Sequence, residues 1–243
     1  MVSAKEIFID YHLLDFIVVI ILCVFWYILQ NANPNRLYVP KRDPRCSYPH
    51  YDTGMKEATN LIVVIAFPYI VYTILYAILK TKGIMDGLIP FDYLFVLIGH
   101  FGCLVLGNIL GNILKLQVGR PRPDFFDVLG INANSETQQP ENLSNKQYME
   151  CFKSFPSGHT ISASCGILFL IIFISKCVIT HQFWVFFLKM CPILYTFYIA
   201  SMRITEHRHH FEDVLAGLII GFLFPIIFFF GASDHVFTPK VMP

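Results

Sequence analysis

Six stretches of the chain are almost continuously apolar, and polar connections separate them. A helix needs about 20 apolar residues to cross the hydrocarbon core of a bilayer, and each stretch is close to that length. The stretches 61–79 and 214–232 carry no charged residue at all. The other four contain a few polar or charged residues; they are 13–29, 91–114, 161–179 and 183–200. The pattern predicts an all-α integral membrane protein with six transmembrane helices.

Composition agrees with this class. Of the 243 residues, 55% are hydrophobic and only 14% are charged, which is less charge than the surface of a soluble domain of this size needs. The net charge of +1 supplies no basic field for nucleic acid, so no nucleic-acid partner is expected. No internal repeat divides the chain. We expect residues 1–243 to form a single six-span domain in contact with the lipid bilayer.

The connections between the spans indicate where a site would lie. With six spans, both termini lie on one side of the membrane. The two long connections, 30–60 and 119–153, then emerge on the other side together with the connection at 203–213. Lys, Arg and His gather at the ends of the apolar segments on this face. We therefore expect an active site at this one membrane face.

Three cations on this face suit the binding of phosphate. Lys115 and Arg122 stand at the end of the third span, and Arg203 ends the fifth. Phosphoryl transfer concentrates negative charge on oxygens, and catalysis consists mostly of positioning and charge stabilisation. The planar guanidinium binds two oxygens at once. The three side chains could form a cage for a phosphoryl group.

The sequence Pro156-Ser157-Gly158-His159 opens the fourth span. Ser157 is suited to cap the helix, and Gly158 lets a ligand approach the backbone closely. The free N–H groups and the dipole of a helix N-terminus attract anions. His159 would then face the phosphate and could protonate a leaving oxygen.

His209 and Asp213 are four residues apart at the start of the sixth span. On a helix this spacing places them on one face. A carboxylate there would hold one imidazole nitrogen protonated and leave the other as a nucleophile.

Together these stretches resemble the three signature motifs of the type 2 phosphatidic acid phosphatase family, also called lipid phosphate phosphatases: K-x6-RP, PSGH and SR-x5-H-x3-D. Only Met202 departs, where the family usually has Ser. The resemblance implies that His209 is the nucleophile and forms a phosphohistidine, that Asp213 orients it, and that His159 is the general acid. It implies no cofactor and no metal. The residues implied to hold the phosphate are Lys115, Arg122, Ser157, Gly158 and Arg203.

The resemblance also implies the substrate class. It comprises lipid phosphates such as phosphatidate, lysophosphatidate, diacylglycerol pyrophosphate and sphingosine phosphate. Residues 119–126, GRPRPDFF, are most similar to the phosphatidate and diacylglycerol pyrophosphate phosphatases. One alternative is a polyprenyl diphosphate or sphingoid phosphate phosphatase. Another is a non-catalytic membrane scaffold or lipid-binding relative, which would be expected to lack one of the two histidines.

Neighbouring polar residues have plainer interpretations. Arg120 and Arg208 are interpreted as interfacial anchors, and His207 and His210 as bystanders. His100, inside the third span, is interpreted as a helix-packing group. The cluster of His and Glu at 206–212 matches no standard zinc spacing.

The sidedness of the site rests on the resemblance, which places it on the luminal or extracellular face. The distribution of Lys and Arg does not decide between the two faces. On a luminal face Asn142 becomes a possible glycosylation site. Cys46 and Cys151 lie in polar connections, where an oxidising compartment would allow them to pair.

Overall fold

The computed structural model describes residues 12–40, 43–54, 56–83, 87–130, 144–180 and 182–237. Within these residues, six helical segments are long and apolar enough to cross a membrane. They are α2 (Leu13–Asn31), α3 (Glu57–Lys82), α4 (Tyr93–Val118), α7 (Gly158–Cys177), the pair α8 (Phe183–Met190) and α9 (Ile193–Thr205), and α10 (Phe211–Phe237). The prediction of an all-α, six-span membrane protein is confirmed.

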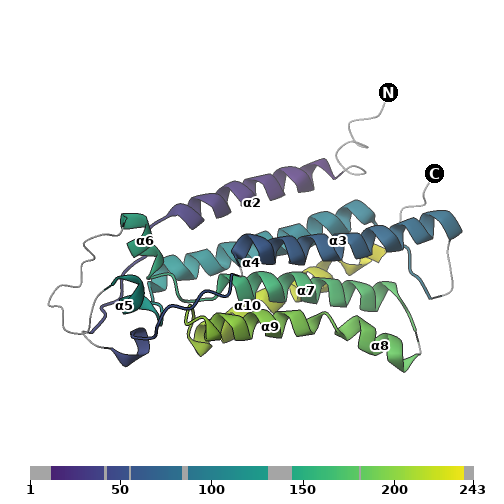
Figure 1. Cartoon of the computed structure of the whole chain (residues 1–243). Coiled ribbons are helices and arrows are strands. Elements are labelled where there is room, and N and C mark those ends of the chain that lie inside the picture. Colours follow the sequence, from purple (N-terminus) through teal and green to yellow (C-terminus); the bar gives the residue numbers. More distant parts are fainter. Residues whose placement is uncertain are drawn as a thin grey trace.

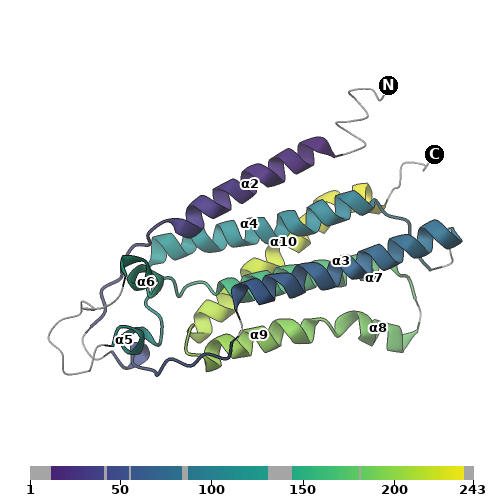
Figure 2. The same cartoon turned by 45° about the horizontal axis from the view of Figure 1, so that its top comes forward.

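The long helices run along one common direction (Figure 1). The short helices α5 (Phe125–Val128) and α6 (Asn145–Glu150) lie together at one end, which we call the polar end. The start of α2 and the finish of α10 lie at the opposite end, as a turned view also shows (Figure 2). A third short helix, η1 (Pro44–Cys46), lies in the connection between α2 and α3.

Helix α7 occupies the centre of the bundle. It contacts α3, α4, α9 and α10, and most of its residues are buried. By contrast, α2 has no buried residue and packs on α4. The PSGH sequence at the start of α7 is therefore surrounded by the helices that carry the other two motifs.

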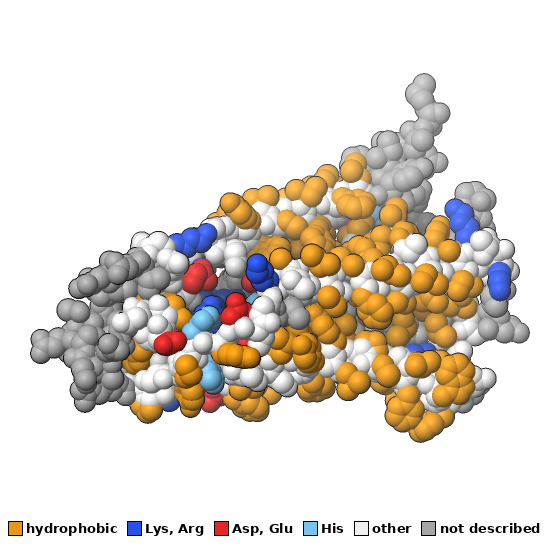
Figure 3. Space-filling model, in the orientation of Figure 1, with side chains coloured by type: hydrophobic (Ala, Val, Ile, Leu, Met, Phe, Trp, Pro, Cys, Tyr) orange, Lys and Arg blue, Asp and Glu red, His pale blue; other side chains and the backbone are white. Residues whose placement is uncertain are grey.

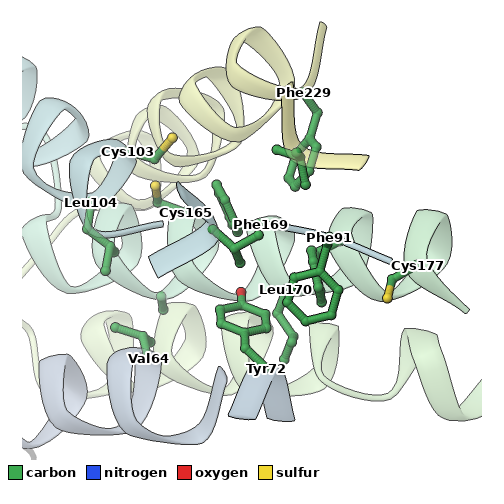
Figure 4. Packing of buried hydrophobic residues seen from close by; sticks show 14 of the residues in the cluster. Val64, Tyr72, Phe91, Cys103, Leu104, Cys165, Phe169, Leu170, Cys177 and Phe229 are labelled. Atoms are coloured by element: carbon green, nitrogen blue, oxygen red, sulfur yellow. The ribbon is translucent and has the colours of Figure 1, made fainter. Parts of the chain in front are cut away.

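Aromatic rings fill the middle of the bundle (Figure 4). The Phe173 ring packs edge-on against Tyr72 and Phe91, with ring centroids 4.8 Å apart in both pairs. His100 is fully buried here, and its Nδ1 lies 2.8 Å from the Tyr72 hydroxyl. His100 is thus part of the core, as expected for a helix-packing group.

The surface divides by chemistry along the same direction. In Figure 3, hydrophobic side chains cover the body of the molecule, acidic and histidine side chains collect at the polar end, and basic side chains lie at both ends. Such an apolar band is what a bilayer requires, since exposed charge there would be costly.

Several helices extend further toward the polar end than the hydropathy pattern predicts. Helix α4 continues to Val118 and so includes Lys115, and α9 continues to Thr205 and so includes Arg203. Hydropathy locates the lipid-facing length, whereas the helix ends where its backbone hydrogen bonds end. Both cations are therefore fixed on rigid helices.

Candidate active site

The end of α4 is shaped by a glycine. Gly119 has φ +59° and caps α4 with its N–H on the Lys115 carbonyl. A side chain here would be strained by the left-handed backbone and would collide with the Asn35 carbonyl. The turn leads the chain out of α4 and carries Arg122 back toward α7.

Lys115 reaches the start of α7. Its Nζ lies 2.8 Å from the point that a Cβ of residue 158 would occupy, so Gly158 leaves the space that the ammonium fills. Among the described residues, Lys115 Nζ makes no hydrogen bond to protein. A cation so placed beside a helix N-terminus is arranged for an anion.

Arg122 lies between the second and third motifs. Its Nε donates to the Glu150 carbonyl at 3.0 Å, and its Nη1 donates to the Arg208 carbonyl at 3.3 Å. Burial, together with the positive charge of Arg208, lowers the pKa of Arg122 to about 10. The guanidinium stays charged at neutral pH, and no carboxylate among the described residues is bonded to it. An incoming phosphate would supply the missing counter-charge.

The hydrogen bonds of His209 fix its tautomer. Nδ1 lies 2.7 Å from the carbonyl oxygen of Ser154, and a carbonyl can only accept, so Nδ1 carries the proton. Nε2 then presents its lone pair. Burial and the charges of Arg122 and Lys115 lower the pKa of His209 well below its usual value. The ring is therefore neutral at neutral pH, as a nucleophile must be.

Asp213 contacts the neighbours of His209 rather than His209 itself. Its carboxylate is 4.0 Å from His209 Nδ1, too far for a hydrogen bond. It accepts instead from the Ser154 hydroxyl at 2.6 Å, the His210 backbone N–H at 2.8 Å and Arg120 Nη1 at 2.8 Å. The expected direct bond to His209 is thus replaced by a relay through Ser154.

The reason for this difference is that α10 begins at Phe211. His209 precedes the helix, so the four-residue spacing does not place it and Asp213 on one helical face. The turn before α10 brings the imidazole to the Ser154 carbonyl instead. The two residues nevertheless lie close together, with His209 Nδ1 4.0 Å from the Asp213 carboxylate.

Arg203 and His159 meet on the other side of the cage. Arg203 Nη1 lies 3.4 Å from His159 Nε2, and Arg203 Nη2 pairs with Glu206. Glu206 is buried and also accepts from the hydroxyl of Thr53. Glu206 therefore holds the guanidinium beside the expected general acid.

Ser157 occupies the N-cap position of α7, as predicted, but its side chain makes no capping bond. Its hydroxyl accepts from the Thr160 hydroxyl at 3.0 Å. Its backbone N–H donates to the Asp213 carbonyl at 2.9 Å. The Ser157 amide therefore joins the second motif to the third.

Residues 43–54 form a strap over the third motif. The carbonyl of Arg45 lies 3.3 Å from His210 Nε2, and the carbonyl of Pro49 lies 2.8 Å from His207 Nδ1. His207 and His210, interpreted as bystanders, thus attach the strap to the site. Arg120, interpreted as an anchor, is instead bonded to Asp213.

Other predicted features lie at the margin of the site or beyond it. Asn142 is outside the described residues. Cys46 and Cys151 are free thiols in the same small buried cluster, and burial raises the pKa of each to about 11. Among the described residues, no group of three His, Cys, Asp or Glu side chains could hold a metal ion.

Sequence reasoning missed three supporting residues: Ser154, Arg120 and Glu206. Glu206 had a usable signal, because it stands three residues after Arg203, the spacing of helical ion pairs. The other two had none, since they meet Asp213 from segments 59 and 93 residues away in the chain.

Comparison with known proteins agrees with this geometry. The profile of the PAP2 superfamily matches residues 96–234, more than half of the chain. The chain is 28% identical to "Probable lipid phosphate phosphatase 4" of Arabidopsis thaliana over 86% of its own length and 69% of that protein. It is 24% identical to "Diacylglycerol pyrophosphate phosphatase 1" of Saccharomyces cerevisiae over 90% of its own length and 78% of that protein.

No solved structure gives a significant match. The family match spans all three motifs, which the fold brings to one end of a six-helix bundle. The chain therefore belongs to the PAP2 superfamily.

Proposed function

We propose that this protein is a membrane-embedded phosphomonoesterase that removes phosphate from lipid phosphates such as phosphatidate, lysophosphatidate, diacylglycerol pyrophosphate and sphingosine phosphate. The observation that carries the proposal is a neutral, buried His209 beside the charges of Lys115 and Arg122. Relatives with phosphatase names cover most of the chain. The site lies where apolar helices end, so a lipid could keep its acyl chains in the bilayer.

The first step transfers the phosphoryl group to the enzyme. Nε2 of His209 attacks phosphorus, and the bond between phosphorus and the lipid oxygen breaks. His159 gives its proton to that oxygen as it departs. Lys115, Arg122 and Arg203, with the Gly158 amide, stabilise the charge on the phosphoryl oxygens.

The second step releases phosphate. A water molecule attacks phosphorus in the phosphohistidine, and the bond to Nε2 breaks. His159, now neutral, takes the proton from that water and is ready for another cycle. The products are the dephosphorylated lipid and inorganic phosphate, and no cofactor enters either step.

Asp213 acts through Ser154 in this scheme. The Ser154 hydroxyl donates to Asp213 while the Ser154 carbonyl accepts from His209 Nδ1. The carboxylate thereby fixes the carbonyl that orients the nucleophile. Its negative charge, 4.0 Å from Nδ1, also stabilises the imidazole ring when it becomes positive in the phosphohistidine.

The polar end is proposed to face the lumen or the exterior. Glycosylation of Asn142 in a eukaryotic host would place this end there, and Asn142→Gln would then sharpen the gel band. A C-terminal tag would be protected in intact cells. A tag that reacts only from outside would reverse the orientation without changing the chemistry.

Activity of the purified full-length protein tests the function. Wild type should release phosphate from phosphatidate in detergent micelles, while His209→Ala should release none. Brief incubation with phosphate-labelled substrate should leave acid-labile label on wild type and none on His209→Ala. Equal label on both proteins would show that the nucleophile is another residue, with His210 the next to test. No turnover of any lipid phosphate would favour a non-catalytic, lipid-binding relative.

A further inference from the structure

Arg208 is held beside the nucleophile by a buried carboxylate. Its Nη1 donates to Asp124 Oδ2 at 3.0 Å, and the Asp124 side chain is only 1% exposed. The same oxygen lies 2.7 Å from Nδ1 of His50, in the strap. Arg208 directly precedes His209, so this anchor fixes a cation at the edge of the cage.

Both Asp124 and Arg208 have side-chain atoms that make no hydrogen bond within the described residues. Asp124 Oδ1 is buried and has no hydrogen-bond partner among the described residues. Within the same residues, Nε and Nη2 of Arg208 donate to no protein acceptor; Nη1 alone is engaged. Buried polar atoms are normally paired, and an open guanidinium edge binds two oxygens of an anion. The free N–H groups of Arg208 can therefore receive an anion, whereas Asp124 Oδ1 can only accept from a donor.

Arg208 adjoins the cage, since Arg122 Nη1 donates to its carbonyl oxygen at 3.3 Å. Its positive charge acts on both Arg122 and Arg203, so three guanidinium groups lie close enough to repel one another. The side chains around the site differ in exposure: His209 is 3% exposed, Arg203 is 6% and Arg208 is 27%. Arg208 is thus the most exposed of these three side chains, and we call its side of the site the mouth.

We propose that Arg208 binds the second phosphate of lipid diphosphates and sets the preference for them over monophosphates. The proposal rests on the phosphatase function proposed above. The terminal phosphate must reach His209 in the depth of the site, so the inner phosphate lies one P–O–P linkage nearer the mouth, where Arg208 has its open edge. Asp124 and His50 are positioning residues for that edge.

The chemistry of the leaving group separates the two substrate types. When a terminal phosphate is transferred from a diphosphate, the P–O–P bond breaks and the departing group is itself a phosphate. Its negative charge needs a cation more than a proton. A monophosphate releases an alkoxide, which needs the proton of His159. Arg208 should therefore matter chiefly for diphosphates, and His159 chiefly for monophosphates.

The experiment compares two substrates on each variant of the full-length enzyme. These are diacylglycerol pyrophosphate labelled in its terminal phosphate, and phosphatidate with the same acyl chains in the same micelles. Arg208→Gln should lower kcat/KM for the diphosphate at least about tenfold more than for phosphatidate. Asp124→Asn should shift the ratio in the same direction. Arg36→Gln, which removes an exposed arginine between α2 and α3, should leave the ratio unchanged.

The ratio of kcat/KM for the diphosphate to kcat/KM for phosphatidate separates an effect on substrate preference from an effect on folding. A misfolded fraction lowers both rates by the same factor, so it cannot move the ratio. If Arg208→Gln is inactive on both substrates, Arg208→Lys, which keeps the charge but loses the two-pronged contact, must still lower the ratio. An unchanged ratio in the Arg208 variants would overturn this proposal while leaving the phosphatase function intact. A wild type inactive on both lipids would overturn the phosphatase function itself.

Discussion

The polar end and the aromatic middle of the bundle both contain fully buried side chains, but different forces hold them in place. Phe169 in the middle and Asp213 at the polar end are both 0% exposed. Phe169 packs against the rings of His100 and Phe229, with centroids 4.9 and 4.8 Å away. Asp213 instead accepts hydrogen bonds from three separate segments of the chain.

The difference shows how stability and chemistry are divided between the two regions. Packed rings lose contact energy gradually when one of them is trimmed. Buried charges have a high desolvation cost and depend on each partner. At the polar end Lys115 and Arg122 have no bonded carboxylate within the part of the chain that the structure describes, and an anionic substrate would supply the counter-charge. Substitutions in the two regions should therefore separate activity from stability.

The largest effect is expected for Asp213→Asn. An amide group would present N–H to at least one of the donors that now point at the carboxylate, so the Ser154 relay would be lost. We expect kcat to fall by about four orders of magnitude, as for the aspartate of a catalytic triad. Initial rates on phosphatidate measure this fall in kcat.

Glu212→Gln is the matched control, because Glu212 is exposed and bonded only weakly by the same Arg120. This substitution should change kcat less than about twofold. An Asp213→Asn enzyme with a tenth of wild-type activity would contradict the relay.

The next effect depends on the substrate. His159→Ala should lower kcat by about 10²–10⁴-fold for an alkyl phosphate, since the alkoxide needs a proton. An aryl phosphate with a good leaving group should lose less than about tenfold. Parallel assays on phosphatidate and p-nitrophenyl phosphate give the comparison. His235→Ala, at the far end of α10 against Phe95, is the control and should affect neither. Equal losses on both substrates would remove His159 from the role of general acid.

A substitution in the aromatic middle should have the opposite profile. Phe169→Ala leaves a cavity and should lower the free energy of unfolding by about 3–5 kcal/mol. The activity per folded molecule should stay within about twofold of wild type, since the ring contacts of Phe169 are with other core rings, those of Tyr72, His100, Phe228 and Phe229. Denaturation in mixed micelles measures the free energy of unfolding, and active-site titration gives the activity per folded molecule. Phe230→Ala, which removes a ring that is 94% exposed, should change neither the stability nor the activity. A selective loss of kcat in Phe169→Ala would show that the two regions are coupled.

The smallest effect is expected from chelation. Activity in excess EDTA should equal activity without it, because Lys115, Arg122 and Arg203 supply the positive charge that Mg²⁺ supplies in other phosphoryl-transfer enzymes. Orthovanadate, which mimics five-coordinate phosphorus, should inhibit under the same conditions. Activity that disappears with EDTA and returns with Mg²⁺ or Zn²⁺ would refute the expectation.

The supporting bonds around the site were only partly accessible from sequence. The helical spacing of Arg203 and Glu206 could have predicted their ion pair. The spacing of His209 and Asp213 predicted a direct bond, which is absent because the helix begins two residues after His209. Spacing specifies a contact only where the backbone conformation is regular, and the turn before α10 is not regular.

The sequence alone determined the six apolar helices and the end of the bundle at which the motifs gather, and it supplied the residues proposed for the cage, because these depend on local hydropathy and on short motifs. The tertiary structure alone decided which group touches which: the Ser154 carbonyl on His209, Arg120 on Asp213, and Asp124 on Arg208. Each of these bonds joins residues more than 50 positions apart. Their geometry follows from how the helices and loops pack, and no local pattern in the sequence encodes it.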